Sequence, residues 1–388
     1  MTDSVTFIFS AIFLGAAAVA SLALYTRQPI IIAYIALGVA LGPYGSGVID
    51  DTELVAQSGH IGIIFLLYLL GLDMQPRALF NSLRAASLVA VASSFLFLLL
   101  GFGVTRAFGF NTKDAAIVGA ALMFSSTIIG IKLLPTTVLH HRHIGEMLVA
   151  LLLFQDLLAI VLLVILQNSG VESEGLVGLL QPLATLPLLG GFCWAIVRRV
   201  LLPLISRFDH YHEYIFLLSV GWCLGIAELA ALLGLSAEIG AFIAGVSVAT
   251  SPIAQYIAVS LKPLRDFFLV IFFFAVGAQF DLTRIPEVGL MALVLAGLLL
   301  LLKPLVYQLL LRGVSETPAL AWNLGFRLGQ CSEFALLIAF LASSLELLSD
   351  DAATLIQATT IITLIVSSYI VVLNFPTPIA IREALRRD

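Results

Sequence analysis

The sequence predicts an all-α polytopic membrane protein with about 13 transmembrane helices, and its composition and the spacing of its apolar runs support this fold class. Of 388 residues, 61% are hydrophobic and 11% are charged, against roughly 45–50% and 25% in soluble domains. The apolar residues form runs close to the roughly 20 residues that cross a bilayer core. The formal net charge is −5 without any long basic run, so nucleic-acid binding is excluded. A soluble enzyme is excluded by the composition.

Turn residues and charges divide the chain into the predicted spans. Connections such as Gly42-Pro43, Pro135 and Pro286 are short, so no soluble domain is expected between the first and last spans. The predicted spans are 4–24, 28–42, 55–72, 85–108, 114–134, 144–167, 175–200, 212–234, 237–256, 266–280, 287–311, 318–343 and 354–374.

The positive-inside rule predicts the orientation of the chain, because an odd number of spans puts the two termini on opposite sides. With the N-terminus outside, 14 of the 19 Lys and Arg residues are cytoplasmic. Arg106, Lys113 and Arg284 are outside, and Lys303 and Arg327 lie within spans. The C-terminus is therefore expected in the cytoplasm. The cytoplasmic residues are Arg27, Arg77, Arg84, Lys132, Arg142, Arg198, Arg199, Arg207, Lys262, Arg265, Arg312, Arg382, Arg386 and Arg387.

The spans also divide into two inverted six-helix repeats with a linker helix between them. The first repeat covers about 4–167, the linker helix about 175–200 and the second repeat about 212–374. Transporters of this design carry interrupted helices at corresponding positions of the two halves. The fifth span contains the polar break 125–127 and the twelfth contains 329–333. We therefore expect a functional site at the membrane midplane.

Asp156 is the strongest candidate for an ion-binding residue, because it lies near the middle of the sixth span. A charge at the bilayer centre costs about 2.5–3.5 kcal/mol on insertion scales, so it marks a functional group. A buried carboxylate can exchange a proton for a metal cation. The Gln155 carbonyl, the hydroxyls of Ser125, Ser126 and Thr127, and carbonyls freed at the break could complete an oxygen shell for a monovalent cation. The alternative is a structural acid paired with a neighbouring base.

Lys303, Arg327 and Glu333 are further charges within predicted spans. Lys303 could pair with Asp156, act as a second proton carrier, or form a purely structural ion pair. Arg327 and Glu333 are six residues apart, about 240° around a regular helix, so a direct pair would require a broken helix. We interpret Arg327 and Glu333 as a structural charge network in preference to cation ligands.

Other polar residues are weaker candidates. Glu228 and Glu238 lie toward the outer surface, where they could line a funnel or reach the headgroup region, and Ser332 belongs to the second break. The run 140–143, His-His-Arg-His, falls in a predicted cytoplasmic loop. It could sense pH, but we favour the interpretation that it is a solvated interfacial loop.

A series of short segments along the chain carries a family resemblance. They are 41–43 (LGP), 67–73 (LYLLGLD), 124–127 (FSST), 153–156 (LFQD), 239–245 (IGAFIAG), 272–277 (FFFAVG), Lys303 and 329–334 (GQCSEF). In this order they resemble the second subfamily of monovalent cation:proton antiporters, and in particular its potassium-efflux (Kef-type) branch. The resemblance covers most of the chain.

The resemblance implies a homodimer in the bacterial inner membrane, in which a core domain carries the ion past a dimerisation domain by an elevator motion. Asp156 matches the ion-binding acid of the family. The pair Gln155-Asp156 matches the Kef-type pattern, which implies electroneutral exchange and favours K⁺ over Na⁺. No cofactor is implied. His60, Asp73 and Cys331 depart from the family pattern, in positions that bear on gating and pH response.

The resemblance also bears on regulation, since Kef-type proteins commonly continue into a cytoplasmic nucleotide-binding domain, and we expect none within this chain. A separate cytoplasmic regulatory subunit is one expectation, and unregulated activity or a shortened chain are the others. Three rival functions stay open. They are a sodium-coupled organic-anion symporter of similar architecture, a cation channel, and an intramembrane enzyme, for which the sequence offers no HExxH or comparable motif.

Overall fold

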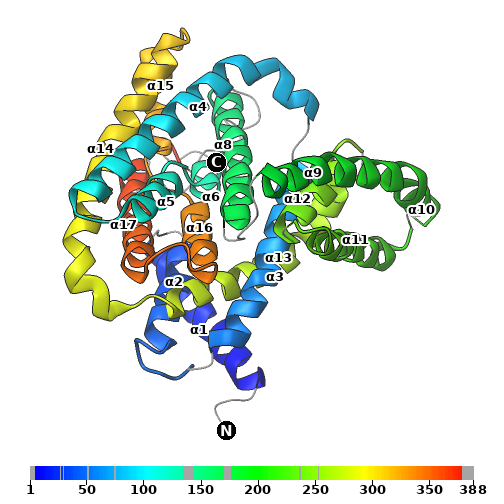
Figure 1. Ribbon diagram of the computed structural model, residues 1–388, viewed down its shortest axis with the longest axis horizontal. Helices are drawn as coiled ribbons and strands as arrows, with labels where there is room; N and C mark the ends of the chain where they lie inside the picture. Colours follow the sequence, from blue (N-terminus) through cyan, green and yellow to red (C-terminus); the bar gives the residue numbers. More distant parts are fainter. Residues whose placement is uncertain are drawn as a thin grey trace. The chain divides into compact units, whose positions relative to one another are not determined.

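The computed structural model describes residues 5–377 except for 27, 29, 50–51, 74–75, 134–142, 170–175, 209, 236 and 252 (Figure 1). The described residues form helices joined by loops, which confirms the all-α prediction for this part of the chain. The chain divides into two compact units. The first contains 1–50, 81–163 and 276–388, and the second contains 51–80 and 164–275. Each unit therefore takes segments from both predicted repeats.

The first unit contains both interrupted helices. Helix α17 packs against the long helix α14 and the shorter helices α5, α15 and α16, all of which are labelled in Figure 1. The helices of this unit are α1 (Val5–Tyr25), α2 (Ile30–Leu41), α4 (Pro76–Ala107), α5 (Thr112–Leu122), α6 (Thr127–Lys132), α8 (His143–Ser169), η2 (Leu282–Arg284), α14 (Ile285–Gly313), α15 (Pro318–Arg327), α16 (Glu333–Ser344) and α17 (Asp350–Asn374). The first residues of α4 and the last of α8 belong to the second unit.

The second unit is built on a close crossing of two helices, α3 (Thr52–Asp73) and α12 (Ala237–Ala249). A Cβ atom on Gly245 would lie 2.1 Å from the carbonyl oxygen of Tyr68, and one on Gly71 would lie 2.4 Å from that of Phe242. Glycine is therefore required on both helices. The other elements are α9 (Leu176–Ile196), the π-helical turn η1 (Val197–Leu201), α10 (Leu202–Arg207), α11 (His212–Leu232) and α13 (Ala254–Ala278), whose last residues belong to the first unit.

Both predicted breaks are present. Helices α5 and α6 are separated by 123–126, and α15 and α16 by 328–332. The prediction was wrong for α13, which begins at Ala254 and runs through Pro263, whereas 266 was the expected start. A proline inside a helix removes one hydrogen bond. Here Ala254, Ile257 and Leu261 are buried in the core of the second unit, and this packing outweighs the loss.

Seven helices within the described residues are long and apolar enough to cross a membrane, judged by length and composition. They are Val5–Tyr25, Ala86–Ala107, His143–Leu163, Thr185–Arg207, His212–Leu232, Leu282–Gly313 and Asp350–Asn374. Shorter apolar helices occur at Ile30–Leu41, Gln57–Leu72, Ala237–Ala249 and Glu333–Ser344. The number of spans, the inverted repeats and the orientation stay predictions.

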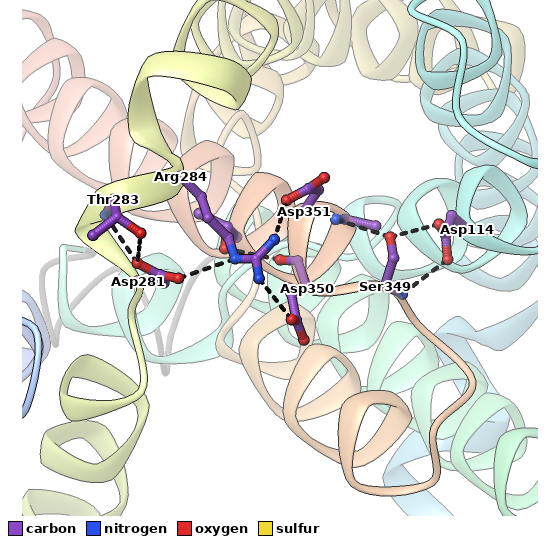
Figure 2. A network of polar contacts seen from close by, with 9 residues as sticks. Asp114, Asp281, Thr283, Arg284, Ser349, Asp350 and Asp351 are labelled. Atoms are coloured by element: carbon purple, nitrogen blue, oxygen red, sulfur yellow. Dashed lines mark hydrogen bonds and ion pairs between the residues drawn. The ribbon is translucent and has the colours of Figure 1, made fainter.

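A polar cluster joins the start of α14 to the start of α17 (Figure 2). The Arg284 guanidinium lies 3.0 Å from Asp281, 2.8 Å from Asp350 and 2.5 Å from Asp351. In the same view, the Ser349 hydroxyl donates to an Asp114 carboxylate oxygen at 2.6 Å, which ties α17 to α5. Arg284 was predicted to lie outside the membrane, but sequence reasoning did not identify these partners.

Candidate functional site

The carboxylate of Asp156 lies beside the break between α5 and α6. Asp156 is in α8, well inside the helix, and its side chain is 2% exposed. The hydroxyl of Thr127, the first residue of α6, is 3.1 Å from each of the two carboxylate oxygens. The break thus delivers a hydroxyl to an otherwise apolar helix face, and Asp156 and Thr127 are brought together as the sequence predicted.

Gln155 and Ser125 are also brought together at this break. The Ser125 main-chain N–H donates to Gln155 Oε1 at 3.1 Å, and Gln155 Nε2 donates to the Tyr307 hydroxyl at 2.6 Å. The Ser125 hydroxyl is 3.3 Å from the Tyr307 hydroxyl and donates to the Leu328 carbonyl oxygen at 2.8 Å. Gln155 therefore has hydrogen-bond partners at both ends of its amide.

The serines Ser126 and Ser332 cap the helices that restart after the breaks. The Ser126 hydroxyl accepts from the Ile129 main-chain N–H at 3.2 Å, and the Ser332 hydroxyl accepts from that of Phe334 at 3.1 Å. Serine is favoured at such positions because its hydroxyl satisfies an N–H that the helix leaves free. Their hydroxyls therefore stabilise the breaks, and cation contact by either residue stays a prediction.

The ammonium group of Lys303 binds main-chain carbonyl oxygens. Its Nζ donates to Phe124 at 2.7 Å and to Gln330 at 3.0 Å, and it lies 5.3 Å from the centre of the Phe97 ring. The suggested partnership with Asp156 is thus corrected, since both donated bonds go to residues in the two breaks. These carbonyls are free because the preceding helix stops two residues before Phe124 and three before Gln330, and a cation is their natural partner.

The guanidinium of Arg327 likewise binds neutral acceptors. It donates to Asn323 Oδ1, to the Leu133 carbonyl and to the Pro376 carbonyl, each at 2.7 Å. Lys303 and Arg327 were expected to form a charge network with Glu333. In the structure, both basic side chains instead donate to neutral acceptors, which are main-chain carbonyl oxygens and the Asn323 side-chain oxygen. Glu333 begins α16, is 5% exposed, and interacts electrostatically with Asp156.

The weaker candidate residues, Glu228, Glu238 and the histidine run 140–143, form no hydrogen bond or ion pair with Asp156 in the part of the chain that the structure describes. Glu228 is in the second unit, on an exposed face of α11. Glu238 is buried in that unit, and its carboxylate lies 2.7 Å from His60 Nε2, one of the positions that depart from the family pattern. His143 is exposed at the start of α8, 2.8 Å from Glu316, while His140 and His141 lie outside the described residues. The Asp73 side chain also lies outside them.

Sequence reasoning did not name two buried residues of this site as site residues, although it placed one of them, Gln330, in the second break. Tyr307 follows Lys303 by four residues on α14, which places both on one face of the helix. That spacing was the available signal. Gln330 lies within the second break, and its side-chain oxygen accepts from the Ser367 hydroxyl of α17 at 2.9 Å.

The arrangement can hold a small cation through oxygen atoms. Asp156 provides a carboxylate and Thr127 a hydroxyl, and hard cations bind such ligands. No group of three or more His, Cys, Asp or Glu side chains suited to a metal ion occurs among the described residues. The Asp156 and Glu333 carboxylates interact electrostatically in a buried region, where a proton or a cation reduces their repulsion.

Comparisons with known proteins agree with this geometry. The family described as "Sodium/hydrogen exchanger, transmembrane" matches residues 8–373. The iron transporter MagA of Paramagnetospirillum magneticum is 28% identical over 353 residues, which cover 88% of this chain and 79% of MagA. In Arabidopsis thaliana, K⁺ efflux antiporter 5 is 28% identical over 87% of this chain, and K⁺ efflux antiporter 4 is 29% identical over 87%.

The chain spans about three fifths of those plant relatives, 61% of antiporter 5 and 58% of antiporter 4. Among solved structures, the sodium proton antiporter of Methanocaldococcus jannaschii has the same fold. The TM-score is 0.69 at 21% identity, covering 92% of this chain and 93% of that one. The matched family model covers nearly the whole sequence and includes both interrupted helices and Asp156. The chain therefore belongs to the transmembrane sodium/hydrogen exchanger family.

Proposed function

We propose that this protein exchanges a monovalent cation, with K⁺ favoured over Na⁺, for a proton, one for one and therefore without net charge transfer. The observation that carries the proposal is the buried Asp156 carboxylate with Thr127 Oγ1 at 3.1 Å from both of its oxygens. In this arrangement one carboxylate holds either a proton or a cation. Competition for a single acid couples the two fluxes, because binding of one ion displaces the other.

The charges around the site support a neutral cycle. Lys303 and Arg327 donate their hydrogen bonds to main-chain carbonyl oxygens and to one amide oxygen. Their positive charges therefore stabilise these neutral acceptors, and the Asp156 carboxylate stays available to the transported ions. When a cation replaces the proton on Asp156, the bound site has the same net charge. One-for-one exchange at this acid then moves no charge across the membrane.

The preference for K⁺ rests on the pair Gln155-Asp156 and on the plant relatives named K⁺ efflux antiporters. Another relative is named an iron transporter, so Fe²⁺ belongs in the panel of test cations. Na⁺ is the alternative monovalent substrate, as the family description indicates.

The proposed setting is the bacterial inner membrane, with a homodimer, the N-terminus outside and the C-terminus in the cytoplasm. Asp156, Thr127, Gln155 and Lys303 all belong to the first unit, which we assign as the mobile core of an elevator. The second unit is then the static part that carries the dimer contact. A cytoplasmic regulatory subunit is a further proposed partner.

The test is exchange in sealed, acid-loaded proteoliposomes that contain a pH dye, with the membrane potential clamped. K⁺, Na⁺, Li⁺ or Fe²⁺ is added outside to the wild type, to Asp156→Asn and to Asp114→Asn. Asp114 is a matched control, since it is also a buried aspartate of the first unit, but its carboxylate accepts from Ser349. We expect alkalinisation by K⁺ with the wild type and Asp114→Asn, and none with Asp156→Asn.

Near-normal exchange by folded Asp156→Asn would overturn the assignment of the site. An exchange rate that changes with the clamped potential would contradict electroneutrality, and a response to an organic solute in place of any cation would favour the symporter. Arg327 offers little to such an anion, because its three donated bonds already go to Asn323, Leu133 and Pro376.

A further inference from the structure

A chain of buried hydrogen bonds runs from the helix that carries Asp156 to both helix breaks. Gln155 Nε2 is 2.6 Å from the Tyr307 hydroxyl, which is 3.3 Å from the Ser125 hydroxyl, which is 2.8 Å from the Leu328 carbonyl oxygen. Gln155, Tyr307 and Ser125 are each at most 1% exposed. This series of hydrogen bonds is linked to the cation site along the backbone. Gln155 directly precedes Asp156, and Ser125 lies two residues before Thr127.

The direction of each bond in this chain is fixed by groups that have only one role. The Leu328 carbonyl can only accept, so the Ser125 hydroxyl donates to it. The Ser125 main-chain N–H can only donate, so the atom of the Gln155 amide that faces it is the oxygen. The nitrogen of that amide therefore faces Tyr307 and donates to its hydroxyl.

The Tyr307 proton is consequently directed away from Gln155. It is available to the Ser125 hydroxyl at 3.3 Å, which can accept it while donating its own proton to the Leu328 carbonyl oxygen. The Tyr307 oxygen therefore keeps its acceptor role toward Gln155.

We infer that Tyr307 is a positioning residue that sets ion preference, by holding the Gln155 amide in this orientation and by fixing the Ser125 end of the first break. Gln155 then acts through Ser125, as a positioning residue, and Asp156 with Thr127 contacts the cation. The inference rests on the proposed exchange function. It adds to that function the residues that fix the distance between the two cation ligands, Asp156 and Thr127.

Fixed spacing matters because cations of different radius need different distances between ligand oxygens. Selectivity between cations depends on cavity size and on ligand flexibility. Thr127 reaches Asp156 from the break, and Ser125 anchors that break to α8, α14 and the second break. Loss of the Tyr307 hydroxyl frees the Gln155 amide to rotate and lets the break move, so the site accepts K⁺ and Na⁺ more equally.

The test is a double-mutant cycle of Tyr307→Phe, Gln155→Leu and the double variant. Tyr68→Phe is the matched control, because Tyr68 is fully buried and its hydroxyl has no hydrogen-bond partner among the described residues. In proteoliposomes, Tyr307→Phe should change the ratio of apparent KM for K⁺ to that for Na⁺ by about two- to tenfold, the effect of one hydrogen bond. The maximal rate should stay within about twofold.

The cycle has a second measurement that does not depend on transport, the melting temperature of the detergent-solubilised variants in choline buffer. We expect the Tm losses of Tyr307→Phe and Gln155→Leu to be strongly non-additive, and in the Gln155→Leu background Tyr307→Phe should leave the KM ratio unchanged. Additive Tm losses, or a KM ratio that moves no more than in Tyr68→Phe, would overturn the inference. Non-additive Tm losses with no cation-dependent exchange in the wild type would overturn the exchange function while leaving the positioning chain intact.

Discussion

Lys303 Nζ donates to the main-chain carbonyl oxygen of Phe124 at 2.7 Å. Because it also donates to Gln330 at 3.0 Å, one ammonium group serves both interrupted helices. Each acceptor lies just beyond the end of a short helix, α5 or α15, where the helix dipole is negative and the last carbonyls have no partner within the helix. The two breaks therefore share a single positive charge.

Lys303→Met should destabilise the protein strongly, because it leaves two buried carbonyl groups without their donor. We expect the free energy of unfolding to fall by about 2–4 kcal/mol, measured by thermal or denaturant unfolding in detergent. Lys262→Met, at an exposed lysine of α13, should change it by less than about 0.5 kcal/mol. Equal stability of the two variants would show that the carbonyl contacts of Lys303 contribute little.

Thr127→Val should weaken cation binding while preserving the fold, since valine keeps the shape and removes the hydroxyl that faces Asp156. The apparent KM for K⁺ should rise by about three- to tenfold, in line with one lost polar ligand, as measured in proteoliposomes. Thr127→Ser restores the hydroxyl and should recover most of the affinity. A valine variant with the wild-type KM would remove Thr127 from the site.

The glycine crossing in the second unit should tolerate no side chain. Gly245→Val places a Cβ atom 2.1 Å from the Tyr68 carbonyl oxygen, so α3 and α12 must separate. We expect a loss of at least about 3 kcal/mol, seen as a lower Tm or as failure to accumulate. Gly221→Ala is the control, because nothing lies within 4 Å of its Cβ position. Normal stability of Gly245→Val would contradict the close crossing.

Asp281 should stabilise the protein in a pH-dependent way. The Thr283 hydroxyl and main-chain N–H, together with Arg284, hold the pKa of the Asp281 carboxyl below its usual value (Figure 2). A folded pKa below the unfolded one, about 3.9, means that the stabilisation is present above the unfolded pKa. It is lost as the pH falls through the folded pKa.

The measurement is the Tm difference between wild type and Asp281→Asn as a function of pH. It should be largest near pH 6 and should shrink toward zero below about pH 4. A Tm difference that stays constant from pH 6 to pH 3 would show that the charge of the Asp281 carboxylate does not contribute to stability.

The two helix breaks could be predicted from sequence because their residues have a local signature. Ser125, Ser126 and Thr127 interrupt an apolar run, and 329–333 does the same in the second half. The position of Asp156 beside the first break followed from its depth in α8. These features depend on composition and spacing, which a single sequence contains.

The partners of the basic residues could not be predicted in the same way. Lys303 and Arg327 bind carbonyls of Phe124, Gln330, Leu133 and Pro376. Every residue has a carbonyl group, so no side chain marks the acceptor. Pairing Lys303 with Asp156 was one of three alternatives that the side chains suggested, and only the three-dimensional arrangement of the breaks shows the carbonyl acceptors.

The hydrogen bonds of Lys303 to Phe124 and Gln330 also constrain the order in which the protein can fold during synthesis. The Phe124 carbonyl obtains its donor from a residue 179 positions later in the chain. During synthesis the first broken helix must therefore enter the membrane before its stabilising charge has been made. We expect the nascent N-terminal half to be retained by the insertion machinery, or shielded by a chaperone, until α14 emerges. Ribosome-stalled fragments that end before and after Lys303 should then differ sharply in their resistance to membrane proteases.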